Sequence, residues 1–226
     1  NTQFMAYHED TYEERKQRIR AIIRDTDEGS DYRAVIRLHD GEVPDNLEKI
    51  LSNHMAWVNE RRDCSDFRLI IMVYMYVRFS HLFSDKLKRD VEDAMAGYRY
   101  WCDEPGDDVM WFFSENHALM FHISQYFAGQ SMPERIFTCS GLTGREACKK
   151  AERLLNAWFE SFFTDFATEW NSSTYLPIDV MGLGYLYDLT PKGSPLHEKS
   201  KKALDMLAFS LAVNEHRGNI MTSFGR

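Results

Sequence analysis

Polar side chains that could exchange protons crowd the start of one aromatic segment. Glu115, Asn116 and His117 directly follow Ser114, and an apolar run continues from there to Gly129. Ser114 is suited to cap a helix, because its side chain can accept a backbone N–H of the first turn. The pattern predicts a helix over residues 115–129 with three polar side chains at its start.

The helical spacing separates these side chains onto different faces. Glu115, His122 and Tyr126 share one side at intervals of seven and four residues, whereas Asn116 shares an apolar side and is expected to point toward the core. A purely structural alternative is that Asn116 and His117 cap the helix and His122 is a hydrogen-bonded core histidine.

A second polar group lies further along the chain. Glu169, Trp170 and Asn171 close a long aromatic segment, and Tyr175 opens the next one. Aromatic faces beside polar groups suit sugar rings, whose C–H faces stack on them. Glu115 and Glu169 could also be the paired carboxylates of a glycoside hydrolase. The structural alternative is that Trp170 ends a core stripe and Glu169 is a solvated helix carboxylate.

The last long segment ends in His216 and Arg217, followed by Gly218. Gly218 is a suitable C′ residue, and cations are favoured at a helix C-terminus by the helix dipole. A stabilising role therefore competes with a substrate-binding role for His216 and Arg217.

Composition limits the classes of partner. The 226 residues are 44% hydrophobic and carry a formal net charge of −8, which fits a globular chain with a substantial core and argues against nucleic acid as a partner. The longest apolar run, residues 69–77, is too short to span a bilayer, so we expect no membrane partner. No signal peptide is visible, and the sequon at Asn171 matters only in a eukaryotic secretory pathway.

No cofactor and no metal are expected from the motifs. The sequence contains no HExxH motif and no acidic calcium loop, and His117 and His122 are five residues apart and so face different ways. The cysteines are too scattered for a CxxC motif and are expected to be buried thiols. They are Cys64, Cys102, Cys139 and Cys148.

Long amphipathic segments predict an all-α fold. Helices are expected over residues 11–24, 46–62, 66–79, 85–101, 115–129, 144–170, 175–187 and 195–216, and residues 32–38 are expected to form a short strand or extended arm. Some helices are apolar all round and others amphipathic, which favours an α/α toroid, here an incomplete barrel of antiparallel helical hairpins. We expect a single helical domain over residues 1–226, with an N-terminal arm and first helix in 1–45 and the hairpin toroid in 46–226. The start without methionine suggests a segment of a larger protein, so further domains of the same polypeptide are expected partners.

The pair Asn116-His117, followed ten residues later by Phe127-Ala128-Gly129, resembles a helix of the heparinase II/III-like and alginate-lyase-like α/α-toroid polysaccharide lyases. A wider set of motifs resembles a group of uncharacterised bacterial toroid proteins. That set comprises Trp111, the run 114–117, the run 169–171 with Tyr175, and the run 214–218. The lyases often have another Asn where this chain has Glu115, and their β-sandwich domains have no counterpart here.

The resemblance implies an oligo- or polysaccharide ligand and elimination on a uronic-acid polymer, with Asn116 neutralising the sugar carboxylate and His117 acting as base or substrate binder. Residue type and position add Tyr175, Tyr126 or Tyr185 as acid, and Arg217 as a second anion contact. A secreted or periplasmic location would follow from that function. Two alternatives stay open: a glycoside hydrolase that uses Glu115 and Glu169, and a non-catalytic helical binding or scaffolding module.

The expected substrate cleft collects these residues. The expected catalytic residues are Glu115, Asn116, His117 and Tyr175. The expected substrate-binding residues are Trp111, His122, Tyr126, Glu169, Trp170, Asn171, His216 and Arg217.

Overall fold

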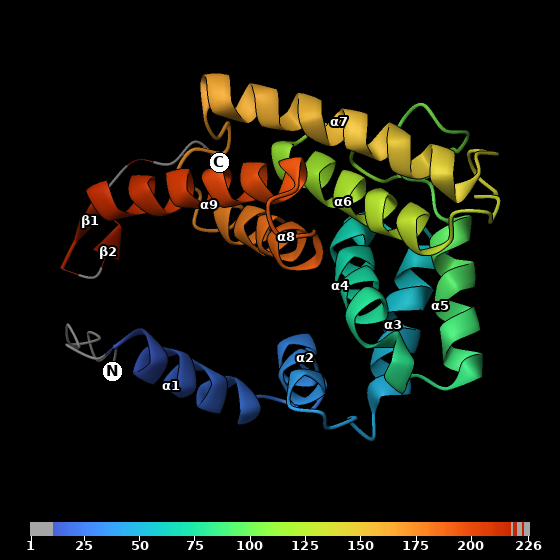
Figure 1. Ribbon diagram of the computed structural model, residues 1–226, viewed down its shortest axis with the longest axis horizontal. Helices are drawn as coiled ribbons and strands as arrows, with labels where there is room; N and C mark the ends of the chain where they lie inside the picture. Colours follow the sequence, from blue (N-terminus) through green and yellow to red (C-terminus); the bar gives the residue numbers. More distant parts are fainter. Residues whose placement is uncertain (1–10, 218, 221–222, 224–226) are drawn as a thin grey trace.

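The computed structural model describes residues 11–217, 219–220 and 223, and helices dominate this part of the chain (Figure 1). The elements are α1 (Tyr12–Arg24), α2 (Asp31–His39), α3 (Leu47–Asn59), α4 (Ser65–Phe79), η1 (Ser80–Leu82), α5 (Asp85–Gly97), α6 (Glu115–Ser131), α7 (Gly144–Asp165), α8 (Leu176–Leu189), α9 (Pro195–Val213), β1 (Glu215–His216) and β2 (Asn219–Ile220). The predicted all-α class is confirmed.

Side-chain caps fix where several helices begin. Ser114 accepts the backbone N–H of His117 at the start of α6, as the sequence predicts. Thr143 and Glu146 form a reciprocal capping box at the start of α7. These two caps set the position of the paired helices α6 and α7 along the chain.

The structure corrects several predicted boundaries. Residues 32–38 are part of helix α2, not a strand or arm, and Ala34 and Leu38 bury one face of it. Helix α7 ends at Asp165, because Phe166 has a positive φ of 63° that breaks the helical path. Helix α9 ends at Val213, and the chain then turns into a two-stranded antiparallel hairpin instead of continuing to His216.

Three helices form the interior of the fold. Helices α4, α6 and α8 contact one another, while α3 and α5 pack on α4, α7 packs on α6 and α9 packs on α8. Figure 1 shows α6 between α7 and α4. Helices α4 and α6 bury nearly all round, as helices packed between layers must. Helix α1 has no buried residue and contacts α2.

No described helix is both long and apolar enough to cross a membrane.

Candidate acid–base site

The first turn of α6 directs its polar side chains toward two different neighbours. Glu115 and Asn116 interact with the segment that joins α7 to α8, and His117 interacts with the start of α4. Successive helix residues are about 100° apart, so Glu115 and His117 cannot share one face. The predicted polar group is therefore divided between two clusters.

Asn116 is held by a single carboxylate oxygen. Its side-chain amide Nδ2 donates to Glu169 Oε2 at 2.5 Å, and its backbone N–H donates to the same oxygen at 3.2 Å. Asn116 is 0% exposed and Glu169 is 3% exposed. The core-facing orientation predicted for Asn116 is observed, and its amide N–H group is directed at a carboxylate.

Glu115 lies between this pair and a small cavity. Its Oε2 accepts the backbone N–H and the hydroxyl of Thr168, whereas its Oε1 is buried with no partner among the described residues. Burial raises the pKa of the Glu115 carboxyl, an effect that the hydrogen bonds from Thr168 partly offset. The cavity measures about 220 Å³, and Trp158, Phe162 and Phe166 form much of its wall.

Asp179, on the interior helix α8, completes the acidic cluster. It is 0% exposed, and neither of its carboxyl oxygens has a hydrogen-bond partner in the described part of the chain. Burial raises the pKa of Asp179 to about 8, and the negative charges of Glu115 and Glu169 add to that rise. Asp179 is therefore largely protonated near neutral pH.

The cluster has more acceptors than donors. Besides the two oxygens of Asp179, Oε1 of Glu115 and Oδ1 of Asn116 are buried without a partner. Ionised carboxylates only accept hydrogen bonds, so a protonated Asp179 adds one donor to a cluster whose unpartnered atoms are otherwise acceptors. Within the described residues, no group of three or more His, Cys, Asp and Glu side chains is placed to hold a metal ion.

His117 belongs to a separate buried pair. Its Nδ1 lies 2.7 Å from Asp66 Oδ2, and its ring stacks on Phe67 with centroids 4.7 Å apart. Burial raises the pKa of the Asp66 carboxyl, while the bond to His117 opposes that rise. This arrangement fixes the orientation of the imidazole ring.

Two further predicted residues lie deeper along α6. His122 is buried against Trp101, with ring centroids 4.4 Å apart, and burial lowers its pKa to about 3. Tyr126 packs edge-to-face on Phe127 and lies near Cys148. Seven residues of helix separate Glu115 from His122 by about 10 Å along the axis. The structure thus places His122 and Tyr126 away from the first turn.

The segment between α7 and α8 holds another three predicted residues. Trp170 is 38% exposed and packs on Phe166, whereas Asn171 is buried with its Oδ1 3.5 Å from Ser210 Oγ. Tyr175 immediately precedes α8 and is half-buried. These residues flank Glu169 in the chain.

The remaining predicted residues are on the surface. Trp111 is 52% exposed and packs against Phe113, and His216 and Arg217 are exposed at the terminal hairpin. Gly218 lies outside the described residues. The four cysteines are free thiols, and none is fully buried, so the expectation of buried thiols is wrong.

Sequence reasoning did not identify Asp179 or Asp66 as site residues. The signal for Asp179 is an acid in the first turn of the apolar helix α8, and Asp66 likewise lies in the first turn of the apolar helix α4. Acids in such settings are almost never fully buried unless paired, which marks them as exceptions.

The fold and cluster define an all-α protein with a buried acidic centre. The chain belongs to the family described as a domain of unknown function, DUF8769, whose model matches residues 55–216. Glu115, Asn116, Glu169 and Asp179 all lie within that match. Neither the curated proteins nor the solved structures gave a significant match to the chain.

Proposed function

We propose that this protein is a carbohydrate-active enzyme that hydrolyses a glycosidic bond by carboxyl acid–base chemistry at Glu115. The observation that carries the proposal is a raised-pKa carboxyl, Glu115, at an aromatic cavity and in electrostatic contact with the proton-holding Asp179. A general acid works best when its pKa lies near the working pH, and burial raises the pKa of both groups toward that range.

Each carboxyl has a distinct role in this proposal. Glu115 borders the cavity and donates its proton to the leaving oxygen as the glycosidic C–O bond breaks. Substrate water forms the new C–O bond at the sugar carbon, and the proton that it loses returns to the Glu115 carboxylate. Asp179 is fully buried and acts as a positioning residue that stores a proton within the cluster. Glu169 fixes Asn116, and through it the first turn of α6.

The same geometry favours a neutral sugar over a uronate. Asn116 would neutralise a substrate carboxylate in the lyase mechanism, but its amide donates to Glu169 and is fully buried. An anionic substrate would also meet the negative charge of Glu169. The hydrolase alternative therefore has stronger support than elimination.

The cavity walls suit one sugar ring. The Trp158 and Phe162 rings stack with centroids 5.0 Å apart, and the Trp158 indole N–H donates to the backbone oxygen of Glu115. A volume of about 220 Å³ is below that of drug-sized pockets, so one ring is the largest group expected to enter.

We also propose that the hairpins are part of an incomplete α/α toroid. Its support is the alternation of interior helices α4, α6 and α8 with exterior helices α3, α5, α7 and α9 along the chain. In a toroid, the interior helices form the inner ring and the helix ends present the site.

The test is a substrate panel of neutral and uronate oligosaccharides. Reducing-end release from a neutral member, abolished in Glu115→Gln and retained in the exposed control Glu160→Gln, is expected. Growth of the ultraviolet absorbance of an unsaturated uronate would overturn hydrolysis in favour of elimination. Absence of turnover together with sugar binding would support the non-catalytic binding module instead.

A further inference from the structure

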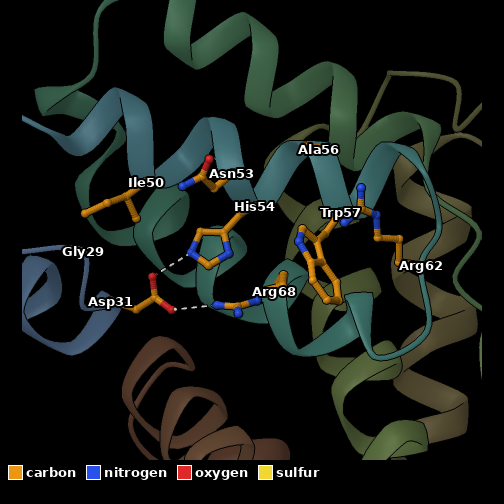
Figure 2. Close-up of a pocket in the computed structure, with 9 residues that line it drawn as sticks. All are labelled: Gly29, Asp31, Ile50, Asn53, His54, Ala56, Trp57, Arg62 and Arg68. Atoms are coloured by element: carbon orange, nitrogen blue, oxygen red, sulfur yellow. Dashed lines mark hydrogen bonds and ion pairs between the residues drawn. The ribbon is translucent and has the colours of Figure 1, made fainter.

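A second, polar cavity lies in the N-terminal part of the chain, among α2, α3 and the start of α4. It measures about 360 Å³ and includes Asp31, His54, Trp57, Arg62 and Arg68 in its wall (Figure 2). None of these residues takes part in the acid–base cluster. Asp31 and His54 also precede residue 55, where the family match begins.

Two arginines give this cavity a positive character. Arg62 and Arg68 lie on the two sides of Trp57, with guanidinium carbons 5.1 and 5.6 Å from the ring centroid. Arg68 Nη1 pairs with Asp31 at 3.3 Å, and Arg62 Nε pairs with Glu60 at 2.6 Å. The other guanidinium nitrogens make no hydrogen bond or ion pair in the described part of the chain, so donors remain for a ligand.

His54 brings an unpaired polar atom to the same cavity. It is 2% exposed, and its Nε2 lies 2.8 Å from Asp31 Oδ1. Its Nδ1 is buried with no partner among the described residues, and Figure 2 shows this nitrogen on the side facing Trp57 and Arg68. A buried ring nitrogen without a partner is costly unless a water or a ligand satisfies it.

The hydrogen bond to Asp31 determines whether Nδ1 of His54 needs a donor or an acceptor as its partner. A carboxylate that accepts from Nε2–H leaves Nδ1 as an acceptor in the neutral ring, and Asp31 is in addition paired with Arg68. The ligand must therefore carry negative oxygens for the arginines and a proton donor for His54. A phosphate monoester has both in its singly protonated form, which is well populated near its second pKa of about 6 and which an acceptor such as Nδ1 would favour, whereas a carboxylate or a sulfate has only acceptors at neutral pH.

We propose that this cavity binds the phosphate group of a small soluble phosphate monoester. Arg68 and His54 contact the phosphate, and Arg62 adds positive charge from the other side of Trp57. The exposed part of the Trp57 side chain then lies beside the organic part of the ligand.

Calorimetric titration of the whole chain with inorganic phosphate and with glycerol 1-phosphate tests the proposal. We expect both to bind and Arg68→Gln to weaken binding by at least about tenfold, which corresponds to the loss of one hydrogen bond to a charged group. Arg62→Gln should weaken binding by about fivefold, because it removes a nearby positive charge. The matched control is Arg89→Gln, which removes the same charge from an exposed site on α5 and should leave the affinity unchanged.

Several outcomes would overturn the proposal. They are the absence of phosphate binding to the unaltered chain, an affinity of Arg62→Gln and Arg68→Gln that equals that of the unaltered chain, or a loss of affinity in Arg89→Gln as large as in those two variants. Sulfate binding as strong as phosphate binding would overturn the role of His54. Stronger binding to phosphatidic acid vesicles than to glycerol 1-phosphate would overturn the assignment to a soluble ligand. Arg62 is half exposed, so its variant should fold and keep the test valid if Arg68→Gln does not.

Discussion

Asn116 donates its backbone N–H and its side-chain amide to one oxygen of Glu169, 53 residues away in the sequence. These two hydrogen bonds join the start of α6 to the segment between α7 and α8. It places Glu115 beside the cavity and explains why a polar residue can be fully buried at this position.

Replacing Asn116 should destabilise the fold. In Asn116→Ala, the buried Glu169 loses the side-chain amide donor and keeps only the backbone N–H of residue 116, and we expect the free energy of unfolding to fall by about 2 kcal/mol. Urea denaturation measures this, with Asn156→Ala, on the half-buried side of α7, as an amide control. An unchanged free energy of unfolding would show that the Glu169 contact contributes nothing. Because the fold itself depends on Asn116, melting of this variant does not distinguish a catalytic from a scaffolding role.

The crossing of α6 and α7 depends on Gly129. A Cβ at this position would lie 2.4 Å from the backbone oxygen of Gly144 and 2.8 Å from the backbone N of Cys148. Backbone cannot move aside as a side chain can, so Gly129→Ala should destabilise the protein by about 2 kcal/mol or more. Gly184→Ala, in open space on α8, should instead stabilise by up to about 1 kcal/mol. Thermal unfolding of the two variants compares them, and equal effects would contradict the close approach.

The Asp66–His117 pair should behave as a coupled unit. Removing one partner leaves the other buried and unpaired, so Asp66→Asn and His117→Gln should each destabilise, and the double variant should lose less than the sum. We expect a coupling free energy above about 1 kcal/mol from a double-mutant cycle in urea. Additive effects would rule out a direct interaction.

His122 should make the fold sensitive to acid. Its pKa falls from 6.5 to about 3 on burial, so the unfolded chain binds a proton in a pH range where the folded chain does not. The stability that neutral His122 contributes is therefore present above pH 6.5 and is lost as the pH falls toward 3, by at most about 1.4 kcal/mol per pH unit. The difference in unfolding free energy between the unaltered chain and His122→Gln should shrink over that range. If this difference in unfolding free energy does not vary with pH, the lowered pKa of His122 is contradicted.

Much of the fold follows from sequence periodicity, but the site follows only in part. The helix cap at Ser114 and the burial of Asn116, which shares a helix side with apolar residues, depend on local sequence and are therefore predictable. Residues 32–38 include Tyr32, Val35 and Ile36, which are residue types common in strands, and their helical state depends on tertiary packing of Ala34 and Leu38. Asp179 joins Glu115 and Glu169 only through packing of α8 on α6, which no local spacing encodes.

The protonation of Asp179 is the most direct test of the proposed acid–base centre. Side-chain carboxyl carbons can be titrated by ¹³C NMR, and the Asp179 resonance is assigned by its loss in Asp179→Asn. We predict a midpoint near pH 8, because burial and the charges of Glu115 and Glu169 disfavour the ionised form. A midpoint in the ordinary aspartate range, about 4, would mean that Asp179 is ionised at neutral pH and would contradict the proposed centre.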